Sequence, residues 1–438
     1  MPLDLPSHPL RPMRQLRLRA VTFRALASIV ACAATVSILG GCAAPNPASA
    51  GLAPPPATPL EPTSASIDEG FAAWLADFRA RALSEGIRET TLRSSLDRAR
   101  HLPEVVERDR SQPEFTRTPW AYLDSAVSPQ RVSRGLEKLG QVRPDAEAAS
   151  SRYGVPPEIL VAIWGMESNY GSNYGSTPTV DALATLGFDG RRADWARREL
   201  LAALRILDQG DIEPERMVGS WAGAMGQTQF LPSNFLAYAV DADGDRRRDI
   251  WGSLPDVMAS TANFLARSGW KPGEAWGVEV MLPAGFDPGR ADPALRQAAA
   301  QWAGEGVQGV DSQPLPSLGD AELLLPAGAR GPAFLVGNNF RTLLRYNNST
   351  SYALAVGLLS QRLAGGAEVR AAWPRDLAPL GRSQVLALQT LLNQRGFDSG
   401  MPDGLLGPAT RDAVRRYQRS RGLPPDGYPT EPLLQQLR

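Results

Sequence analysis

The residue whose position most clearly suggests chemistry is Glu167, in the segment Gly165-Met166-Glu167-Ser168-Asn169-Tyr170-Gly171. The apolar residues 156–164 before it predict a helix that opens on proline, because the first helical turn needs no N–H from that residue. Glu167 continues the apolar stripe that begins at Leu160. A glutamate on such a stripe is either a buried structural partner or a proton donor whose pKa burial raises. Gly171 is expected to end the helix and open the chain around the carboxylate.

The structural alternative for Glu167 is a buried ion pair with an arginine such as Arg191 or Arg192. Spacing alone does not choose between this ion pair and a general acid. The composition of the whole chain and its other motifs must therefore decide.

The supply of histidine and cysteine argues against several kinds of active site. The only histidines are His8 and His101, the only cysteines are Cys32 and Cys42, and two of these four lie in a removable N-terminal segment. Ser-His-Asp and Cys-His catalysis, a Cys/His zinc site and a disulfide framework are therefore not expected. The formal net charge of +0, with no long basic run beyond the N-terminus, argues against nucleic acid as a partner. The chemistry that remains uses carboxylates, hydroxyls, amides or a hard metal ion.

Residues 1–41 are typical of a secretory signal peptide, with arginines in the first part and small, apolar residues over 25–41. Leu39-Gly40-Gly41-Cys42 resembles the cleavage and lipidation box of bacterial lipoproteins, so Cys42 is expected to become an acylated N-terminus in the periplasm. By the same resemblance, alanine rather than aspartate after Cys42 favours lipid of the outer membrane, in its inner leaflet. The alternative is an ordinary signal peptide with an incidental cysteine. A retained membrane helix is disfavoured, because the apolar stretch falls short of about 20 residues.

Five regions follow from changes in composition along the chain. They are the lipoprotein signal peptide 1–41, a Pro/Ala-rich tether 42–66, a large body 67–365, a linker 366–380 and a small module 381–438. The body is predicted to be mainly α with a minor β component. Apolar residues recur at helical spacing over 70–100, 193–208, 255–268 and 351–363, and residues 277–282 are typical of a strand.

Several sequence blocks of the body resemble those of a known enzyme family. In chain order they are TPWAYL (118–123), IWGMESNYG (163–171), DALATL (181–186), GSWAGAMGQTQFLPS (219–233), GNNF (337–340) and RYNNS (345–349). Together they make residues from about 70 to 363 resemble the B-type lytic murein transglycosylases, which are lysozyme-like enzymes that cleave bacterial peptidoglycan. The resemblance implies a lysozyme-like, α-rich catalytic domain over 67–365.

The resemblance also implies roles for single residues. It makes Glu167 the one catalytic acid, puts Ser220, Gln229 and Asn347 in sugar subsites, and puts Tyr122, Tyr346 and Tyr352 at aromatic walls of the cleft. The residue types agree, because the Gly/Ala-rich segment 219–233 lets backbone approach a ligand and offers neutral hydrogen-bonding groups, which suit a sugar. As alternatives, Ser220 could cap a helix and the tyrosines could be core residues.

Residues 241–249 resemble a calcium loop. Asp241, Asp243 and Asp245 occupy positions one, three and five, and Arg247 offers its backbone carbonyl at position seven. The standard loop wants glycine at position six and glutamate at twelve, where this chain has Arg246 and Gly252. By resemblance to the family the closing carboxylate is Asp256, with Asp249 in reserve. The expected ion is a structural Ca²⁺, and the alternative is that arginines of the loop pair with its aspartates and leave no metal.

The last 60 or so residues resemble the small peptidoglycan-binding domain, a three-helix bundle found on many wall enzymes. The matching blocks are LQTLLN (388–393), DGLLGPAT (403–410), YQ (417–418) and GLPPDG (422–427), and its two Asp-Gly turns look like halves of a repeat. Two apolar stripes are predicted, one of Leu386, Leu388, Leu391 and Leu392 and one of Ala413, Val414 and Tyr417. A generic helical oligomerisation module is the alternative.

The reaction that the resemblance implies needs one acid. Most glycoside hydrolases place two carboxylates around the bond, whereas the segment 219–233 holds no second acid to complement Glu167. A lytic transglycosylase would cleave the β-1,4 bond between N-acetylmuramic acid and N-acetylglucosamine in peptidoglycan glycan strands, leaving 1,6-anhydromuramyl ends and requiring no cofactor. A hydrolytic muramidase and a non-catalytic wall-binding scaffold are the alternatives. Other wall enzymes are a further class of partner that this location allows.

Overall fold

The computed structural model describes residues 64–110, 117–189 and 191–438. The predicted signal peptide, the lipidation box with Cys42 and nearly all of the predicted tether lie outside these residues. The first helix begins at Ser64, which is inside the predicted tether. Within the described ranges, no helix combines the length and the apolar character that a membrane span requires.

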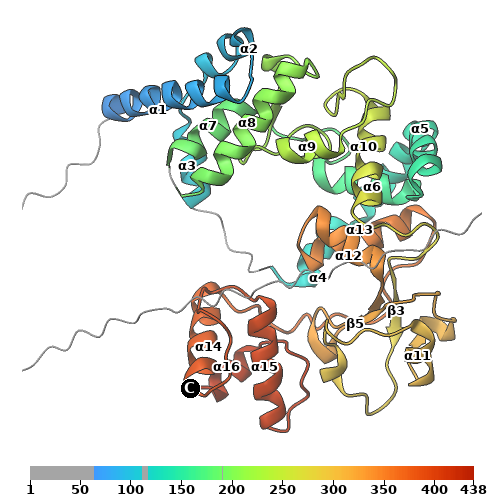
Figure 1. Cartoon of the computed structure of the whole chain (residues 1–438). Coiled ribbons are helices and arrows are strands. Elements are labelled where there is room, and N and C mark those ends of the chain that lie inside the picture. The colour runs from blue at the N-terminus through green and yellow to red at the C-terminus, as the bar shows by residue number, and fades with distance from the viewer. Residues whose placement is uncertain (1–63, 111–116, 190) are drawn as a thin grey trace, which may run out of the picture. The chain divides into compact units, whose positions relative to one another are not determined.

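The first group of helices forms around a packed pair, α7 (Thr179–Asp189) and α8 (Ala193–Gln209) (Figure 1). The helices that pack on this pair are α1 (Ser64–Ser84), α2 (Glu89–Ser94) and α3 (Pro103–Arg110), with the short η1 (Leu96–Arg98) beside them. The helical pattern over 70–100 is therefore interrupted. Gly86 has a φ of 88°, which glycine adopts readily, and this turn separates α1 from α2.

The centre of the body is α6 (Pro157–Ser168), which other helices enclose. It packs on α5 (Pro129–Tyr153), α10 (Leu254–Arg267) and α13 (Thr350–Leu363), and the last of these also contacts α4 (Pro119–Ala126) and α12 (Asn338–Tyr346). Figure 1 shows α6 beside α5 and α10. Residues 159–165 of α6 are all buried, which explains why this stretch is apolar on every side. The two ends of α6 reach the surface of the enclosing helices, at Pro157 and Glu158 and again at Met166 and Glu167.

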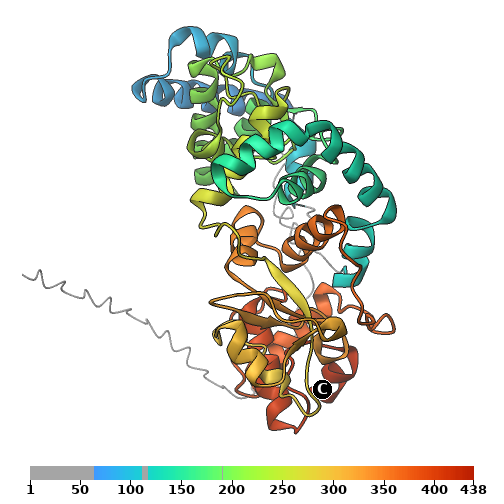
Figure 2. The same ribbon diagram turned by 90° about the vertical axis from the view of Figure 1, so that its right-hand side faces the viewer.

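The β component is small, as predicted. A four-stranded antiparallel sheet has the order β4-β3-β6-β5, with bounds Gln308–Gly309, Gly277–Met281, Ala333–Val336 and Glu322–Leu324. The strand expected at 277–282 is β3, the long yellow arrow in Figure 2. The hydrophobic core beside this four-stranded sheet contains Trp302 of α11 (Ala299–Gly304), which is fully buried. The body also contains a two-stranded sheet, formed by β1 (Thr177–Pro178) and β2 (Val218–Gly219), and the helix α9 (Pro232–Tyr238). Its loops include four short 3-10 helices, η2 (Pro214–Arg216), η3 (Pro288–Arg290), η4 (Val310–Ser312) and η5 (Gly328–Arg330).

The C-terminal module has three helices and its own core. They are α14 (Arg382–Gln394), α15 (Pro408–Ser420) and α16 (Glu431–Gln436). The second predicted stripe is fully buried, and of the first stripe Leu388 and Leu392 are buried and Leu391 partly so. Leu386 does not belong to the stripe, because its side chain is 41% exposed.

The segment between α13 and α14, residues 364–381, has neither helix nor strand. Two of its backbone N–H groups, at Arg370 and Ala371, donate to the buried carboxylate of Glu279 on β3 at 2.8 Å each. Further along, the guanidinium of Arg375 forms a two-point ion pair with Asp124, with N···O distances of 2.7 and 2.8 Å. The predicted linker is therefore held against the body at Arg370, Ala371 and Arg375.

Candidate active site

The end of α6 sets the position of Glu167. The helix stops at Ser168 because Asn169 and Tyr170 adopt left-handed backbone, with φ of 49° and 59°, and Gly171 follows with φ of 76°. The expectation that Gly171 ends the helix is thus wrong by two residues. Asparagine tolerates the left-handed conformation better than most residues, so the turn begins there. Glu167 lies in the last turn of the helix, directly before this reversal.

The ring of Tyr170 holds the reversal between two helices. Its hydroxyl donates to the backbone oxygen of Arg131 on α5 at 2.9 Å. A Cβ on Gly165 would lie 2.5 Å from the Tyr170 ring, and one on Gly135 would lie 2.5 Å from its hydroxyl. Both glycines therefore make room for the ring, and Arg131 donates in return to the Gly165 carbonyl at 2.5 Å.

Glu167 has the surroundings of a proton donor. The Tyr352 hydroxyl donates to its Oε1 at 2.5 Å. Burial raises the pKa of Glu167 to about 7, and the hydrogen bond from Tyr352 opposes the rise. The alternative ion pair is not formed, because Arg191 and Arg192 both pair with Asp109, at 2.5 and 2.6 Å.

Three tyrosines gather around this carboxylate from three helices, Tyr122 from α4, Tyr346 from α12 and Tyr352 from α13. Burial raises the pKa of each phenol, and the negative charge of Glu167 adds to the rise in all three. Tyr352 is buried, whereas Tyr122 and Tyr346 are partly exposed. The Tyr346 hydroxyl donates to the Thr228 carbonyl at 2.7 Å, which joins this group to the segment 219–233. The structure thus brings together all the predicted aromatic residues and the acid.

The predicted sugar-binding residues lie on loops and helix ends. Ser220 does not cap a helix: its hydroxyl accepts the Ala224 N–H at 3.1 Å inside a tight turn. Gln229 has a φ of 51°, and its amide nitrogen donates to two carbonyls, of Tyr174 and Gly226, both at 2.9 Å. No described residue donates a hydrogen bond to its amide oxygen. Asn347 follows α12 in an extended conformation and is exposed.

Gln227 belongs to the neutral hydrogen-bonding groups of the segment 219–233, but the sequence assigned it no role of its own. Its oxygen accepts the indole N–H of Trp164 at 2.8 Å, and its nitrogen donates to the Trp251 carbonyl at 2.7 Å. It therefore ties α6 to the loop that presents Gln229. A Cβ on Gly171 would lie 2.3 Å from the Gln227 oxygen, so glycine is needed there too. Its place between two predicted binding residues was the available signal.

The acidic loop brings three carboxylates together. Oxygens of Asp241, Asp243 and Asp256 all lie within 4.8 Å of one another, and Asp256 is fully buried. Its two oxygens accept the N–H groups of Ala242 and Asp249, both at 2.7 Å. Burial raises the pKa of Asp256 to about 6; those N–H groups oppose the rise and the charge of Asp243 adds to it.

The other predicted residues of the loop stand outside this group. Asp245 is exposed and its carboxylate accepts the backbone N–H of Arg247 at 2.7 Å. Asp249, the reserve ligand, pairs instead with Arg216 at 3.3 Å. Two of the loop arginines form ion pairs with acids outside the loop and not with its aspartates. Arg247 pairs with Glu213 at 3.7 Å and Arg248 with Asp211 at 2.5 Å, both away from the three carboxylates.

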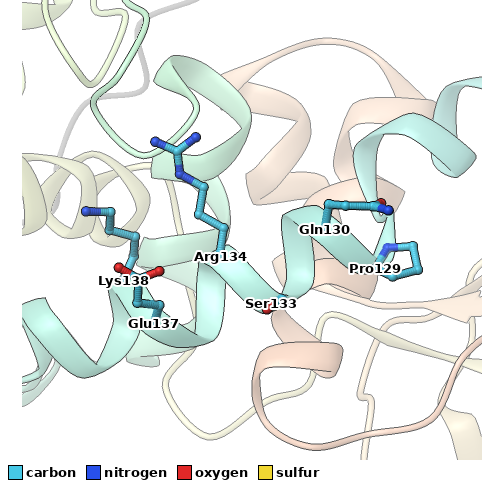
Figure 3. A pocket seen from close by; sticks show the side chains of 6 residues that line it. All are labelled: Pro129, Gln130, Ser133, Arg134, Glu137 and Lys138. Atoms are coloured by element: carbon cyan, nitrogen blue, oxygen red, sulfur yellow. The ribbon is translucent and has the colours of Figure 1, made fainter.

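An open pocket of about 670 Å³ lies along α5, lined by Pro129, Gln130, Ser133, Arg134, Glu137 and Lys138. Figure 3 shows Arg134 and Lys138 projecting from the same stretch of this helix. None of the predicted site residues lines it, so this pocket is not the place where Glu167 and the tyrosines meet.

Comparison with known families covers most of the described chain. The family described as Transglycosylase SLT domain matches residues 70–361, and a peptidoglycan binding domain family matches residues 381–437. Membrane-bound lytic murein transglycosylase B of Escherichia coli (strain K12) is 36% identical over 250 residues, which are 56% of this chain and 66% of that protein.

Solved structures give a closer match. SltB3 from Pseudomonas aeruginosa in complex with NAG-NAM-pentapeptide is 52% identical, with a TM-score of 0.82, over 84% of this chain and 99% of that one. The Escherichia coli lytic transglycosylase Slt35 in complex with calcium is 32% identical, with a TM-score of 0.57, over 69% of this chain and 94% of that one. The predicted fold class, mainly α and lysozyme-like with a C-terminal binding module, is confirmed.

Proposed function

Because this chain belongs to the transglycosylase SLT family and is a peptidoglycan lytic transglycosylase, we propose that Glu167 alone carries out its proton transfers. The observation that supports this most directly is the raised pKa of Glu167, about 7, which burial causes. A group whose pKa lies near the working pH can both give and take a proton. The bond cleaved is the β-1,4 bond between N-acetylmuramic acid and N-acetylglucosamine.

In the first step protonated Glu167 gives its proton to the glycosidic oxygen. The bond from that oxygen to C1 of the muramyl residue breaks, and N-acetylglucosamine leaves with a free hydroxyl. The acetamido group of the muramyl residue stabilises the positive charge that develops at C1. The carboxylate that remains on Glu167 keeps the hydrogen bond from the Tyr352 hydroxyl, which favours the ionised form.

In the second step ionised Glu167 takes the proton of the muramyl C6 hydroxyl. The C6 oxygen then bonds to C1 and closes a 1,6-anhydro ring, so no water is consumed and Glu167 returns to its protonated form. The hydrolytic two-acid mechanism needs a second carboxylate across the bond. The segment 219–233, which hydrogen bonds from Trp164 and Tyr346 join to the surroundings of Glu167, contains no acidic residue. This favours ring closure over hydrolysis.

The remaining predicted residues would position the sugars. Gln229 has both N–H bonds committed to carbonyls, which fixes its amide plane and leaves its oxygen to accept from a sugar hydroxyl. Ser220 and Asn347 would supply further hydroxyl and amide contacts, and Tyr122 and Tyr346 the partly exposed aromatic faces. These contributions orient the substrate and transfer no proton.

Calcium binding is proposed for the group Asp241, Asp243 and Asp256. The fit rests on a fully buried carboxylate that faces two others with no arginine paired to it. Oxygen ligands in a flexible loop suit Ca²⁺, and the Asp245 carboxylate and Arg247 carbonyl are the further ligands that the sequence predicts. Its role would be to neutralise the carboxylates and hold the loop. The calcium complex of Slt35 is in keeping with this.

For the ends of the chain we propose a lipid anchor at Cys42 and wall binding by residues 381–438. The anchor rests on the lipidation box, and the relative from Escherichia coli is described as membrane-bound. It would hold residues 67–365 in the periplasm at the outer membrane, through the tether 42–66. The module would raise the local concentration of the enzyme on an insoluble polymer.

Mass spectrometry of the muropeptides that residues 62–438 release from purified peptidoglycan tests the mechanism. Products one water lighter than reducing muropeptides are expected, and Glu167→Gln should abolish them. The matched control is Glu158→Gln, which makes the same change in the first turn of the same helix and should keep activity. Reducing ends would mean hydrolysis, and anhydro products from Glu167→Gln would exclude Glu167 as the acid.

A further inference from the structure

The first Asp-Gly turn of the C-terminal module is held by one glutamine of α14. The Gln389 oxygen accepts the Gly404 N–H at 2.8 Å, and its nitrogen donates to Asp403 Oδ1 at 2.9 Å. The same Oδ1 accepts the Leu405 N–H at 2.8 Å. Gly404 has a φ of 78°. One oxygen of the Asp403 carboxylate therefore holds the turn together.

The second turn repeats these contacts with a glutamine of α15. The Gln418 oxygen accepts the Gly427 N–H at 2.8 Å, and its nitrogen donates to Asp426 Oδ1 at 2.7 Å. Oδ1 again accepts the next N–H, that of Tyr428, at 2.9 Å. Gly427 has a φ of 69°. The two turns are thus equivalent in structure, and each leaves Oδ2 of its aspartate free of the turn.

In the second turn, this Oδ2 accepts a hydrogen bond from the backbone of the body. Asp426 Oδ2 accepts the backbone N–H of Ala329, at η5 of the body, at 2.9 Å. The residue before that N–H is Gly328, with a φ of 71°. A Cβ in the L position of Gly328 would lie 2.5 Å from Asp426 Oδ2 and 2.8 Å from the Tyr428 Cβ. The turn therefore binds a peptide N–H that follows a residue at which an L-amino acid would be strained and crowded.

This contact has a handedness. A positive φ is strained for an L-residue and natural for glycine or a D-residue, whose preferences are the mirror image. In a D-residue the Cβ takes the place of the other Cα hydrogen. It therefore points in a different direction from the L-type Cβ that would meet Asp426. Among peptides with side chains at this position, the turn therefore selects those with a D-residue.

The first turn presents the same features to solvent. Asp403 is exposed, and its Oδ2 takes part in none of the hydrogen bonds among the described residues. The neighbouring cation is Arg382, which donates to the Asp403 carbonyl at 3.2 Å and whose charge helps to lower the pKa of the Asp403 carboxyl. Leu405, which corresponds to Tyr428, is 51% exposed, and the neighbouring Met401 is 87% exposed. Hydrogen bonds from Gln389 and Leu405 keep the pKa of Asp403 below its usual value, so the free oxygen belongs to a carboxylate at neutral pH. An apolar surface and an ionised acceptor thus lie side by side.

We propose that this first turn, residues 402–405, is the wall-binding surface of the module, and that Asp403 Oδ2 accepts a backbone N–H that follows a D-residue of a peptidoglycan stem peptide. The inference rests on the proposed binding of peptidoglycan by the module and names the part of the polymer that is bound. Stem peptides contain D-residues, which ribosomal proteins lack. The N-acetyl groups of the glycan also carry an amide N–H, and the experiment separates the two sources.

The test measures binding of the full chain carrying Glu167→Gln, so that the ligand is not cut. Cosedimentation is measured with intact peptidoglycan sacculi and with sacculi stripped of their peptides by an amidase. Asp403→Asn replaces the free acceptor with a donor and should weaken binding to intact sacculi by roughly tenfold or more, as expected for a hydrogen bond to a charged group. The control Asp412→Asn makes the same charge change on α15 and should bind like the parent.

A second variant and a second ligand keep the outcome clear if Asp403→Asn disturbs the turn. Leu405→Asp keeps the backbone N–H that Asp403 accepts and should also weaken binding, with an unchanged unfolding midpoint. A free pentapeptide with the D-residues of the stem should compete with sacculi, and its all-L isomer should not.

Four results would contradict the proposal in different ways. Full binding by both variants would exclude the first turn. An equal loss on stripped and intact sacculi would assign the N–H to the glycan, and competition by the all-L peptide would exclude the handedness. If the parent itself did not sediment with intact sacculi, the proposed wall binding by the module would fail, and this inference with it.

Discussion

At the scale of single residues, the proposed mechanism requires one carboxylate to serve two opposite proton transfers. Burial favours the protonated form of Glu167, and the Tyr352 hydroxyl favours the ionised form. The balance puts the pKa at about 7, where both forms are populated under working conditions. Tyr352 is itself buried, and its high pKa keeps the hydroxyl protonated as a permanent donor.

Tyr352→Phe is expected to move the alkaline limb of the pH profile of kcat/KM to higher pH. The substitution removes the hydrogen bond that stabilises the ionised form of Glu167, so the pKa of the acid rises and it stays protonated at higher pH. Initial rates of muropeptide release between pH 5 and pH 9 would measure the limb. Tyr122→Phe is the control, because no hydrogen bond joins its hydroxyl to Glu167 among the described contacts, and its limb should stay in place. An unmoved limb in Tyr352→Phe would contradict the role of this hydrogen bond.

Glu167→Gln is expected to stabilise the fold above neutral pH. The pKa of Glu167 is 4.5 in the unfolded chain and about 7 in the folded one, so between these values the folded state binds more protons and its stability falls as the pH rises. The loss is complete above pH 7 and amounts to about 3 kcal/mol at most. Urea unfolding at pH 4 and pH 8 checks this. The variant should gain on the parent only at pH 8, and an equal difference at both pH values would refute the cause.

At the scale of elements, the site depends on how closely α5 and α6 approach each other. Tyr170 fills the space above Gly135 of α5 and Gly165 of α6, and its hydroxyl bonds back to α5. The left-handed turn after Glu167 is held from one side by this ring. The position of the acid is thus set by residues that do not touch it.

Gly135→Ala is expected to destabilise the fold by about 1–3 kcal/mol, the usual effect of forcing an extra methyl group into a packed core. The added Cβ would lie 2.5 Å from the Tyr170 hydroxyl and 2.7 Å from Leu363 Cδ2. Gly140→Ala, on the same helix, meets nothing within 4 Å and should be neutral or slightly stabilising. Denaturant unfolding of both variants measures the difference. Equal stability of the two would show that this contact does not constrain the helices.

The sequence predicted more of the site than of the elements that build it. The acid, the tyrosines and the loop of Gln229 were named because their residue types and blocks resemble those of a family, and the structure brings them together. Their roles in the reaction stay predictions. Helical spacing located α8, α10 and α13 within a residue of their ends, since each has one apolar face. It did not show the reversal at Asn169, the ring of Tyr170 between two glycines or the bonds of Gln227. These depend on contacts between segments far apart in the chain, which no local pattern records.

At the scale of the whole molecule, calcium should affect stability and leave the chemistry unchanged. We expect Ca²⁺ to raise the unfolding midpoint, with about 2.7 kcal/mol of stabilisation at a hundredfold excess over Kd. Asp243→Asn should abolish the rise, whereas Asp245→Asn, outside the group of three carboxylates, should reduce it less. Thermal unfolding with Ca²⁺ and with a chelator measures both. No shift in the parent would exclude the metal, and a change in product type with the chelator would contradict a purely structural role.

The linker of residues 364–381 has a consequence for the products. Its backbone is bound by Glu279, and Arg375 pairs with Asp124, so it is a fitted segment and not a loose one. If the module binds the wall as proposed, a linker bound to the body would keep the bound part of the wall at a set distance from the cleft, and this distance would decide which glycosidic bond the cleft meets. Digestion of long glycan strands should then give a few preferred fragment lengths. Releasing the linker with Glu279→Ala would blur those lengths into a continuous spread.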